Sequence, residues 1–311
     1  MADNPYIATD PVAIMALNNA VADMGRLKSI SALLFDGPPG TGKSFLGEYV
    51  ARLLEARFIR FQIFEGCDRG DLILERGILD RAGRPTKGVL LEAIESSLQQ
   101  ATVLLLDEID KAHPSFDGLL LNFLNDAEIY VPQLGKVFRA NNGQLLILIT
   151  KNDQRDVARA LMDRCRVTYM AWPSMDTETT ILQSYWPFLT TEGAKALLGI
   201  PHRLRIDPSI RKKPSTRIMV RLVSDMMEVI AQTDDLNIGR YYIAQITTIP
   251  QDQEAVTKMY NPLALGRELR EALSPLLEKY TPKEGRTRIP VPNSITHGPT
   301  RKERAISSPV A

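Results

Sequence analysis

A glycine-rich octapeptide behind an apolar stretch constrains this chain more than any other feature of its sequence. It reads Gly37-Pro38-Pro39-Gly40-Thr41-Gly42-Lys43-Ser44, which fits the P-loop pattern Gly-x-x-x-x-Gly-Lys-Ser/Thr. In this motif the glycines let backbone N–H groups surround phosphate oxygens at the N-terminus of a helix. We therefore expect all eight residues to bind a nucleotide, with Lys43 at the terminal phosphates and the Ser44 hydroxyl as a ligand of Mg²⁺.

Short apolar stretches before and after this loop indicate the strands of a sheet. Between them lie segments with helical periodicity, at 11–24, 44–55 and 90–99. Strands that alternate with helices predict an α/β fold of the P-loop NTPase type, with a parallel five-stranded sheet, helices on both faces and ligands at the carboxyl ends of the strands. The expected strands are 31–35, 58–63, 103–106, 145–150 and 167–170.

The segment VLLLDEIDK, residues 103–111, places two acidic groups at the end of one expected strand. The carboxylate of Asp107 can hold Mg²⁺ through a water molecule. The adjacent Glu108 can polarise a second water for attack on a γ-phosphate, a service that a kinase acting on another substrate does not need. Asp107 and Ser44 are thus candidate metal residues, and Glu108 predicts that the nucleotide is hydrolysed.

The strand signals stop near residue 176. We expect a P-loop ATPase domain over 1–175 and a smaller, all-helical lid domain over 176–280, whose last helix, from 262 on, is interrupted at Pro275. Residues 281–311 carry prolines among Lys, Arg and Ser with few large apolar residues, which predicts a disordered C-terminal tail.

Charge and composition name no partner. The 311 residues have a formal net charge of +1, without the basic excess that indicates nucleic-acid binding. Cys67 and Cys165 lack metal-ligand or redox spacing. The first residues do not form a signal pattern, and no apolar run approaches the roughly 20 residues of a membrane span, so we expect a cytoplasmic protein without a membrane partner.

Residues from about 5 to 230 resemble the AAA+ ATPases and, within them, the MoxR-like group. The likeness is carried by the P-loop, by DEIDKAHPSFDGLLLNFLND from Asp107 on and by LILITKND, residues 146–153. It implies that ATP is the nucleotide, with Mg²⁺ as its cofactor. It also implies that Asn152 is the sensor 1 residue that orients the attacking water or reads the γ-phosphate, with Thr150 as the alternative.

Two arginines receive roles from the same resemblance. The segment ALMDRCRV, residues 160–167, is similar to the family's Leu-x-Asp-Arg-Phe, which implies that Arg164 is an arginine finger acting on the neighbouring subunit. Arg159 and Arg166 remain alternatives. Pro214-Ser215-Thr216-Arg217 is similar to the start of the sensor 2 helix, so Arg217 is expected to approach the phosphates of its own subunit. A finger in trans implies a homo-oligomeric ring, a hexamer by resemblance.

Two segments predict hairpins that resemble those of the MoxR-like branch. One lies between 67 and 90 with its tip at 81–84, and the other lies at 128–140 and turns at 134–136. They resemble that branch's helix 2 insert and pre-sensor 1 hairpin. Such hairpins would contact the substrate, or alternatively pack against neighbouring subunits.

The resemblance therefore implies a ring that hydrolyses ATP to remodel or activate a client protein or complex, with a von Willebrand factor A domain protein as a possible partner. Two alternatives stay open. One is a nucleic-acid motor or a component of a nucleic-acid defence system, and the other is a nucleotide-dependent binding switch with little turnover.

Overall fold

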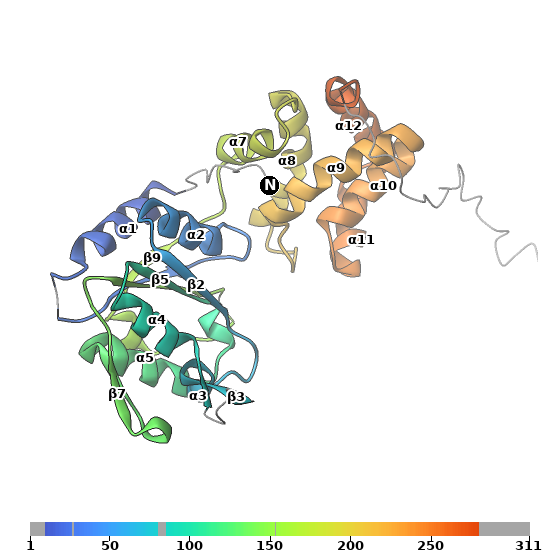
Figure 1. Ribbon diagram of the computed structural model, residues 1–311. Coiled ribbons are helices and arrows are strands. Elements are labelled where there is room, and N and C mark those ends of the chain that lie inside the picture. Colours follow the sequence, from blue (N-terminus) through green and yellow to red (C-terminus); the bar gives the residue numbers. More distant parts are fainter. Residues whose placement is uncertain (1–9, 27, 80–84, 153, 280–311) are drawn as a thin grey trace, which may run out of the picture. The chain divides into compact units, whose positions relative to one another are not determined.

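The computed structural model describes residues 10–26, 28–79, 85–152 and 154–279 of the chain (Figure 1). The chain divides into two compact units, Met1–Thr177 and Glu178–Ala311, and each is described here by itself. The expected tail over 281–311 lies outside the described residues. No helix in the described ranges is long and apolar enough to cross a membrane.

The first unit contains a parallel sheet of five strands in the order β2-β5-β8-β1-β9. This confirms the predicted fold class. Strand β1 lies between β8 and the edge strand β9, so the P-loop that follows it opens one strand in from the edge of the sheet. The strands are β1 (Ser31–Asp36), β2 (Arg57–Gln62), β5 (Thr102–Asp107), β8 (Leu145–Thr150) and β9 (Arg166–Tyr169).

Helices cover both faces of this sheet because the side chains of its strands alternate between two apolar cores. On β5, Val103 and Leu105 belong to the core under α1 (Pro11–Asp23) and α2 (Lys43–Leu53). The alternate residues Leu104 and Leu106 belong to the opposite core, under α4 (Val89–Ser97) and α5 (Ser115–Asp126). Burial on both faces explains why this strand reads as a continuous apolar run.

Two antiparallel hairpins are added to this frame. The first pairs β3 (Leu74–Leu79) with β4 (Pro85–Lys87) between the short helix α3 (Arg69–Ile73) and α4, and its expected tip at 81–84 lies outside the described residues. The second pairs β6 (Glu128–Val131) with β7 (Lys136–Arg139) through the 3₁₀ turn η2 (Pro132–Leu134). The predicted hairpin is confirmed, but its turn begins two residues before the expected 134–136. Two other short elements complete the unit, η1 (Ile109–Lys111) and α6 (Arg159–Met162).

The described part of the second unit is helical. Helices α10 and α12 approach closely, since a Cβ built on Gly266 would lie 1.7 Å from the carbonyl oxygen of Asp235. The helices are α7 (Met175–Tyr185), which begins at the end of the first unit, α8 (Thr191–Ile206), α9 (Thr216–Gln232), α10 (Asp235–Ile246), α11 (Pro250–Met259) and α12 (Pro262–Leu277).

The expected interruption of the last helix at Pro275 is wrong, because α12 continues to Leu277. Proline has no N–H to donate to the carbonyl four residues earlier, which is that of Glu271. The hydroxyl of Ser274 donates to this carbonyl oxygen at 2.9 Å and so replaces the missing bond.

Candidate nucleotide site

The P-loop joins the end of β1 to the start of α2. Gly37, Gly40 and Gly42 all have positive φ angles, at 136°, 81° and 96°. Gly37 has a second constraint, because a Cβ at this position would lie 2.3 Å from the carbonyl oxygen of Met170. A side chain there would therefore require backbone movement as well as strain. The glycine pattern read from the sequence thus matches a turn that closes tightly before the helix.

Lys43 is the first residue of α2 and is only 5% exposed. Its Nζ donates to the carbonyl oxygens of Gly37 at 2.5 Å and Pro38 at 2.8 Å, so the ammonium group lies inside the loop. Burial lowers the pKa of Lys43 to about 8, although the nearby carboxylates, Asp36 first, act in the opposite direction. Because burial disfavours the charged form, the Lys43 ammonium group should bind readily to phosphate oxygens that replace the two carbonyl oxygens.

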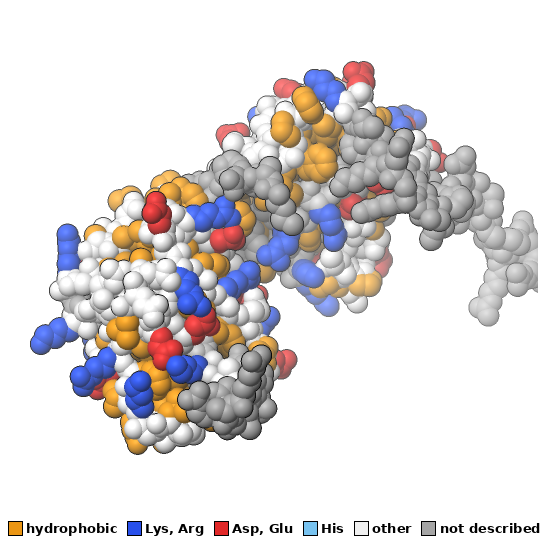
Figure 2. Space-filling model, viewed as in Figure 1, with side chains coloured by type: hydrophobic (Ala, Val, Ile, Leu, Met, Phe, Trp, Pro, Cys, Tyr) orange, Lys and Arg blue, Asp and Glu red, His pale blue; other side chains and the backbone are white. Residues whose placement is uncertain are grey.

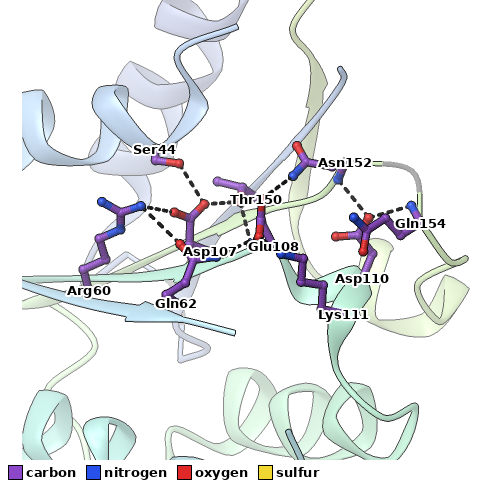
Figure 3. A network of polar contacts seen from close by, with 10 residues as sticks. All are labelled: Ser44, Arg60, Gln62, Asp107, Glu108, Asp110, Lys111, Thr150, Asn152 and Gln154. Atoms are coloured by element: carbon purple, nitrogen blue, oxygen red, sulfur yellow. Dashed lines mark hydrogen bonds and ion pairs between the residues drawn. The ribbon is translucent and has the colours of Figure 1, made fainter. Parts of the chain in front are cut away.

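The carboxylate of Asp107 is buried at the end of β5 and accepts bonds from three elements (Figure 3). Its Oδ1 atom accepts from the Ser44 hydroxyl at 2.8 Å and from the Thr150 hydroxyl at 2.6 Å. Its Oδ2 atom accepts from the Nη2 atom of Arg60 at 2.5 Å. Hydroxyl and carboxylate oxygens are the donors that Mg²⁺ prefers, so Ser44 and Asp107 fit this metal.

Glu108 follows with a backbone conformation that is unusual for a residue with a side chain, φ 64° and ψ 56°. The Thr150 hydroxyl accepts its N–H at 2.8 Å, so one threonine contacts both acidic residues of the pair. Left-handed backbone at a non-glycine residue costs of order 1 kcal/mol and is concentrated at functional sites.

The carboxylate of Glu108 is held by three donors in the same region (Figure 3). Asn152 Nδ2 donates to Oε1 at 2.8 Å, while Gln62 Nε2 donates to Oε2 at 2.8 Å. The Nζ atom of Lys111 also lies 2.5 Å from Oε2. The structure thus brings together Glu108 and Asn152, which the sequence assigns to catalysis, at the ends of neighbouring strands β5 and β8.

The loop that carries Asn152 is fastened by buried carboxylates. Asp110 Oδ2 accepts the backbone N–H groups of Asn152 at 3.0 Å and Gln154 at 2.7 Å. Asp117 pairs with the guanidinium of Arg155 at 2.6 and 2.9 Å. These bonds fix the backbone from which the Asn152 amide reaches Glu108.

The candidate arginine fingers lie around α6. Arg159 begins this helix and Arg164 lies in the turn before β9, and both are exposed. Arg166, on β9, forms an ion pair with Asp23 of α1. Arg217 is the second residue of α9, is exposed and belongs to the second unit. The structure therefore leaves Arg164 and Arg159 directed to solvent, while Arg166 is engaged within its own chain.

Sequence reasoning did not identify three side chains that contact the acidic pair, Arg60, Gln62 and Lys111. Arg60 and Gln62 are two residues apart on β2, and the register pairs Gln62 with Asp107. A signal was present, since residues i and i+2 of a strand share a face. It could be used only once β2 was known to neighbour β5.

Comparisons with known proteins found a matching family model and several similar proteins. A family model described as AAA domain (dynein-related subfamily) matches residues 32–185. A Lon protease of Heliobacterium modesticaldum is 28% identical over 156 residues, which are 48% of this chain and 19% of that protein. The chloroplastic chaperone protein ClpC1 of Oryza sativa subsp. japonica is 27% identical over 258 residues, which are 81% of this chain and 26% of the relative.

Among solved structures, a closed-state reconstruction of Hsp104 with ATPγS and FITC casein is similar in fold, with a TM-score of 0.54 and 20% identity. The likeness covers 71% of this chain and 44% of that one. This chain thus matches about a fifth to a quarter of the length of these Lon and ClpC1 relatives.

Proposed function

We propose that this chain, whose residues 32–185 match the AAA domain (dynein-related subfamily), is a Mg²⁺-dependent ATP hydrolase that works in a ring of identical subunits to remodel a client protein. One observation carries the proposal. At the ends of β5 and β8, Asp107 lies 2.8 Å from the P-loop hydroxyl of Ser44, and Glu108 lies 2.8 Å from the amide of Asn152. A phosphate-binding loop, a metal-binding carboxylate and an oriented base thus lie together.

The residues divide the chemistry between them. The backbone of residues 37–42 and the ammonium group of Lys43 bind phosphate oxygens, and Ser44 and Asp107 are the residues that would hold Mg²⁺. The metal, when bound, supplies positive charge to the phosphates. Glu108 polarises the water that attacks the γ-phosphorus, and the bond to the ADP leaving oxygen breaks. Asn152 keeps the Glu108 carboxylate oriented through the bond to Oε1.

We propose that Arg164 completes the site of a neighbouring subunit. It is exposed in a turn two residues before β9 and can therefore meet another copy of the chain. A guanidinium placed at the γ-phosphate stabilises charge in the transition state. The second unit would serve as the lid and carry Arg217 toward the phosphates, so that the nucleotide state sets the lid position. Six subunits are the number that the resemblance implies.

The client is proposed to be a protein. The relatives named above are a protease and a chaperone protein, and the similar structure contains casein. The hairpin β3–β4 between α3 and α4, and the hairpin β6–β7 before β8, support a place near the MoxR-like group and are proposed to contact the client. A partner with a von Willebrand factor A domain belongs to the same proposal. On the face shown in Figure 2, acidic and basic side chains are mixed over the first unit.

The test is the steady-state ATP turnover of the purified protein with Mg²⁺, alone, with casein, and with single-stranded or double-stranded nucleic acid at two salt concentrations. We expect turnover that nucleic acid does not change and that Lys43→Ala abolishes. Strong stimulation by nucleic acid that fades with salt would instead favour a nucleic-acid motor, because phosphate contacts are salt-dependent. An absence of turnover under all conditions would refute the hydrolase.

A further inference from the structure

Arg60 places a second cation beside the carboxylate that the proposed function assigns to Mg²⁺. Its Nη2 atom donates to Asp107 Oδ2 at 2.5 Å and to Gln62 Oε1 at 3.2 Å (Figure 3). Arg60 lies on β2, an edge strand of the sheet, and pairs in register with Leu105 of β5. Its side chain therefore reaches Asp107 from the strand beside it, at the carboxylate oxygen that the Ser44 hydroxyl does not contact.

The two partners of this ion pair differ in their freedom to move. The Asp107 side chain is only 4% exposed, and its Oδ1 atom is fixed by the hydroxyls of Ser44 and Thr150. The Arg60 side chain is 50% exposed, so its guanidinium can turn into solvent, where water hydrates the charge. A buried carboxylate needs a nearby positive charge. When Mg²⁺ binds this carboxylate, Arg60 is therefore the group that leaves.

We propose that Arg60 and Mg²⁺ exchange at Asp107, and that Arg60 thereby determines how strongly nucleotide binding depends on the metal. This inference rests on the proposed function, which assigns Mg²⁺ to this site. Without the metal, the guanidinium neutralises Asp107 and lessens its repulsion of the phosphates. With the metal, the divalent ion neutralises Asp107 instead, and Arg60 contributes little.

The proposed exchange predicts that loss of Arg60 weakens nucleotide binding in EDTA but not in Mg²⁺. Without Arg60, a metal-free nucleotide meets an uncompensated carboxylate, so its dissociation constant should rise. In Mg²⁺ the same variant should bind nucleotide at least as tightly as wild type, because no guanidinium competes with the metal for the Asp107 carboxylate. The ratio of the dissociation constant in EDTA to that in Mg²⁺ should increase about tenfold, or about 1.4 kcal/mol.

The experiment is calorimetric titration of the full chain with the non-hydrolysable analogue AMP-PNP, once in Mg²⁺ and once in EDTA. Wild type, Arg60→Ala and Arg57→Ala are compared. Arg57 is the matched control, because it lies on the same strand but pairs with Glu92 at its other end. We expect the tenfold increase in the ratio for Arg60→Ala and an unchanged ratio for Arg57→Ala.

Arg60→Lys keeps the proposal falsifiable if the alanine variant does not fold. A lysine retains the charge, so its ratio should return to within about threefold of the wild-type value. If Arg60→Ala weakens binding equally in both buffers, or leaves the ratio unchanged, Arg60 is a structural residue and the inference is wrong. If Arg60→Lys, used in its place, raises the ratio about tenfold, the charge is not the cause and the inference is equally wrong. If wild type does not bind AMP-PNP even in Mg²⁺, the proposed function itself is wrong and the inference with it.

Discussion

Glu178 holds together three segments of the second unit, and replacing it with glutamine is the sharpest test of what stabilises this unit. Its side chain is 0% exposed. The carboxylate accepts bonds from Arg205 at 2.6 and 2.8 Å and from His202 at 2.7 Å. Arg205 also donates from Nε to the carbonyl oxygen of Pro214 at 2.8 Å. The network joins α7, α8 and the segment before α9, the helix that carries Arg217.

The pKa of Glu178 indicates how much its ionised carboxylate contributes to the free energy of unfolding. Burial alone would raise this pKa, but the hydrogen bonds from Arg205 and His202 and the charge of Arg205 outweigh burial and lower the pKa from 4.5 to about 2. Such a difference between unfolded and folded chains corresponds to about 3 kcal/mol of folding free energy at neutral pH. Because the folded pKa is the lower one, this contribution is present above pH 4.5 and is lost as the pH falls toward 2. At pH 3 roughly half of this contribution should remain.

The assay is urea unfolding of Glu178→Gln and its parent, both carrying Trp172→Phe so that fluorescence reports on Trp186. The Nε1 atom of Trp186 donates to the carbonyl oxygen of Val220 within the second unit, at 3.2 Å. Unfolding free energies should differ by about 3 kcal/mol at pH 7 and by about half of this at pH 3. Glu271→Gln, at an exposed carboxylate of α12, is the control. A difference below about 1 kcal/mol at pH 7, or one independent of pH, would refute this reasoning.

The nucleotide site gives three further predictions. Glu108→Gln should retain ATP binding and lower turnover by at least about 100-fold, since an amide cannot act as the base; turnover within about threefold of wild type in a coupled assay would contradict the role. The pKa of about 8 for Lys43 predicts that affinity for MgADP falls above pH 8, by up to tenfold per pH unit, because only the ammonium form attracts phosphate. A calorimetric affinity for MgADP that stays constant up to about pH 9.5 would contradict this. Arg164→Ala should bind nucleotide without hydrolysing it and should recover turnover when mixed with Lys43→Ala subunits. The control Arg166→Ala, which breaks the pair with Asp23, should remain active. Mixed rings that do not recover turnover would contradict the action of Arg164 on a neighbouring subunit.

The parts of the site that the sequence predicts are those specified by local pattern. The positive φ angles of Gly37, Gly40 and Gly42 explain why the P-loop can be recognised as a string of letters. The contact between Glu108 and Asn152 is consistent with the predicted parallel sheet, because the carboxyl ends of parallel strands lie at the same edge of a sheet. The local pattern thus predicts the acidic pair, whereas the resemblance to the AAA+ ATPases supplies Asn152.

The contacts that Arg60, Gln62 and Lys111 make with the acidic pair depend on which strands are neighbours and on the backbone conformation of the residue that follows β5. Arg60 and Gln62 read as the polar face of a half-exposed strand, and they contact the acidic pair only because β2 lies beside β5 in a register that pairs Gln62 with Asp107. Lys111 reaches Glu108 because the left-handed conformation of Glu108 starts a 3₁₀ turn, which places residues three apart on one side. The strand order thus decides whether Arg60 lies in solvent or beside Asp107, and the backbone conformation of Glu108 decides the same for Lys111 beside Glu108. Neither is encoded in a short motif, so side chains that modulate a P-loop site are harder to read from sequence than those that build it.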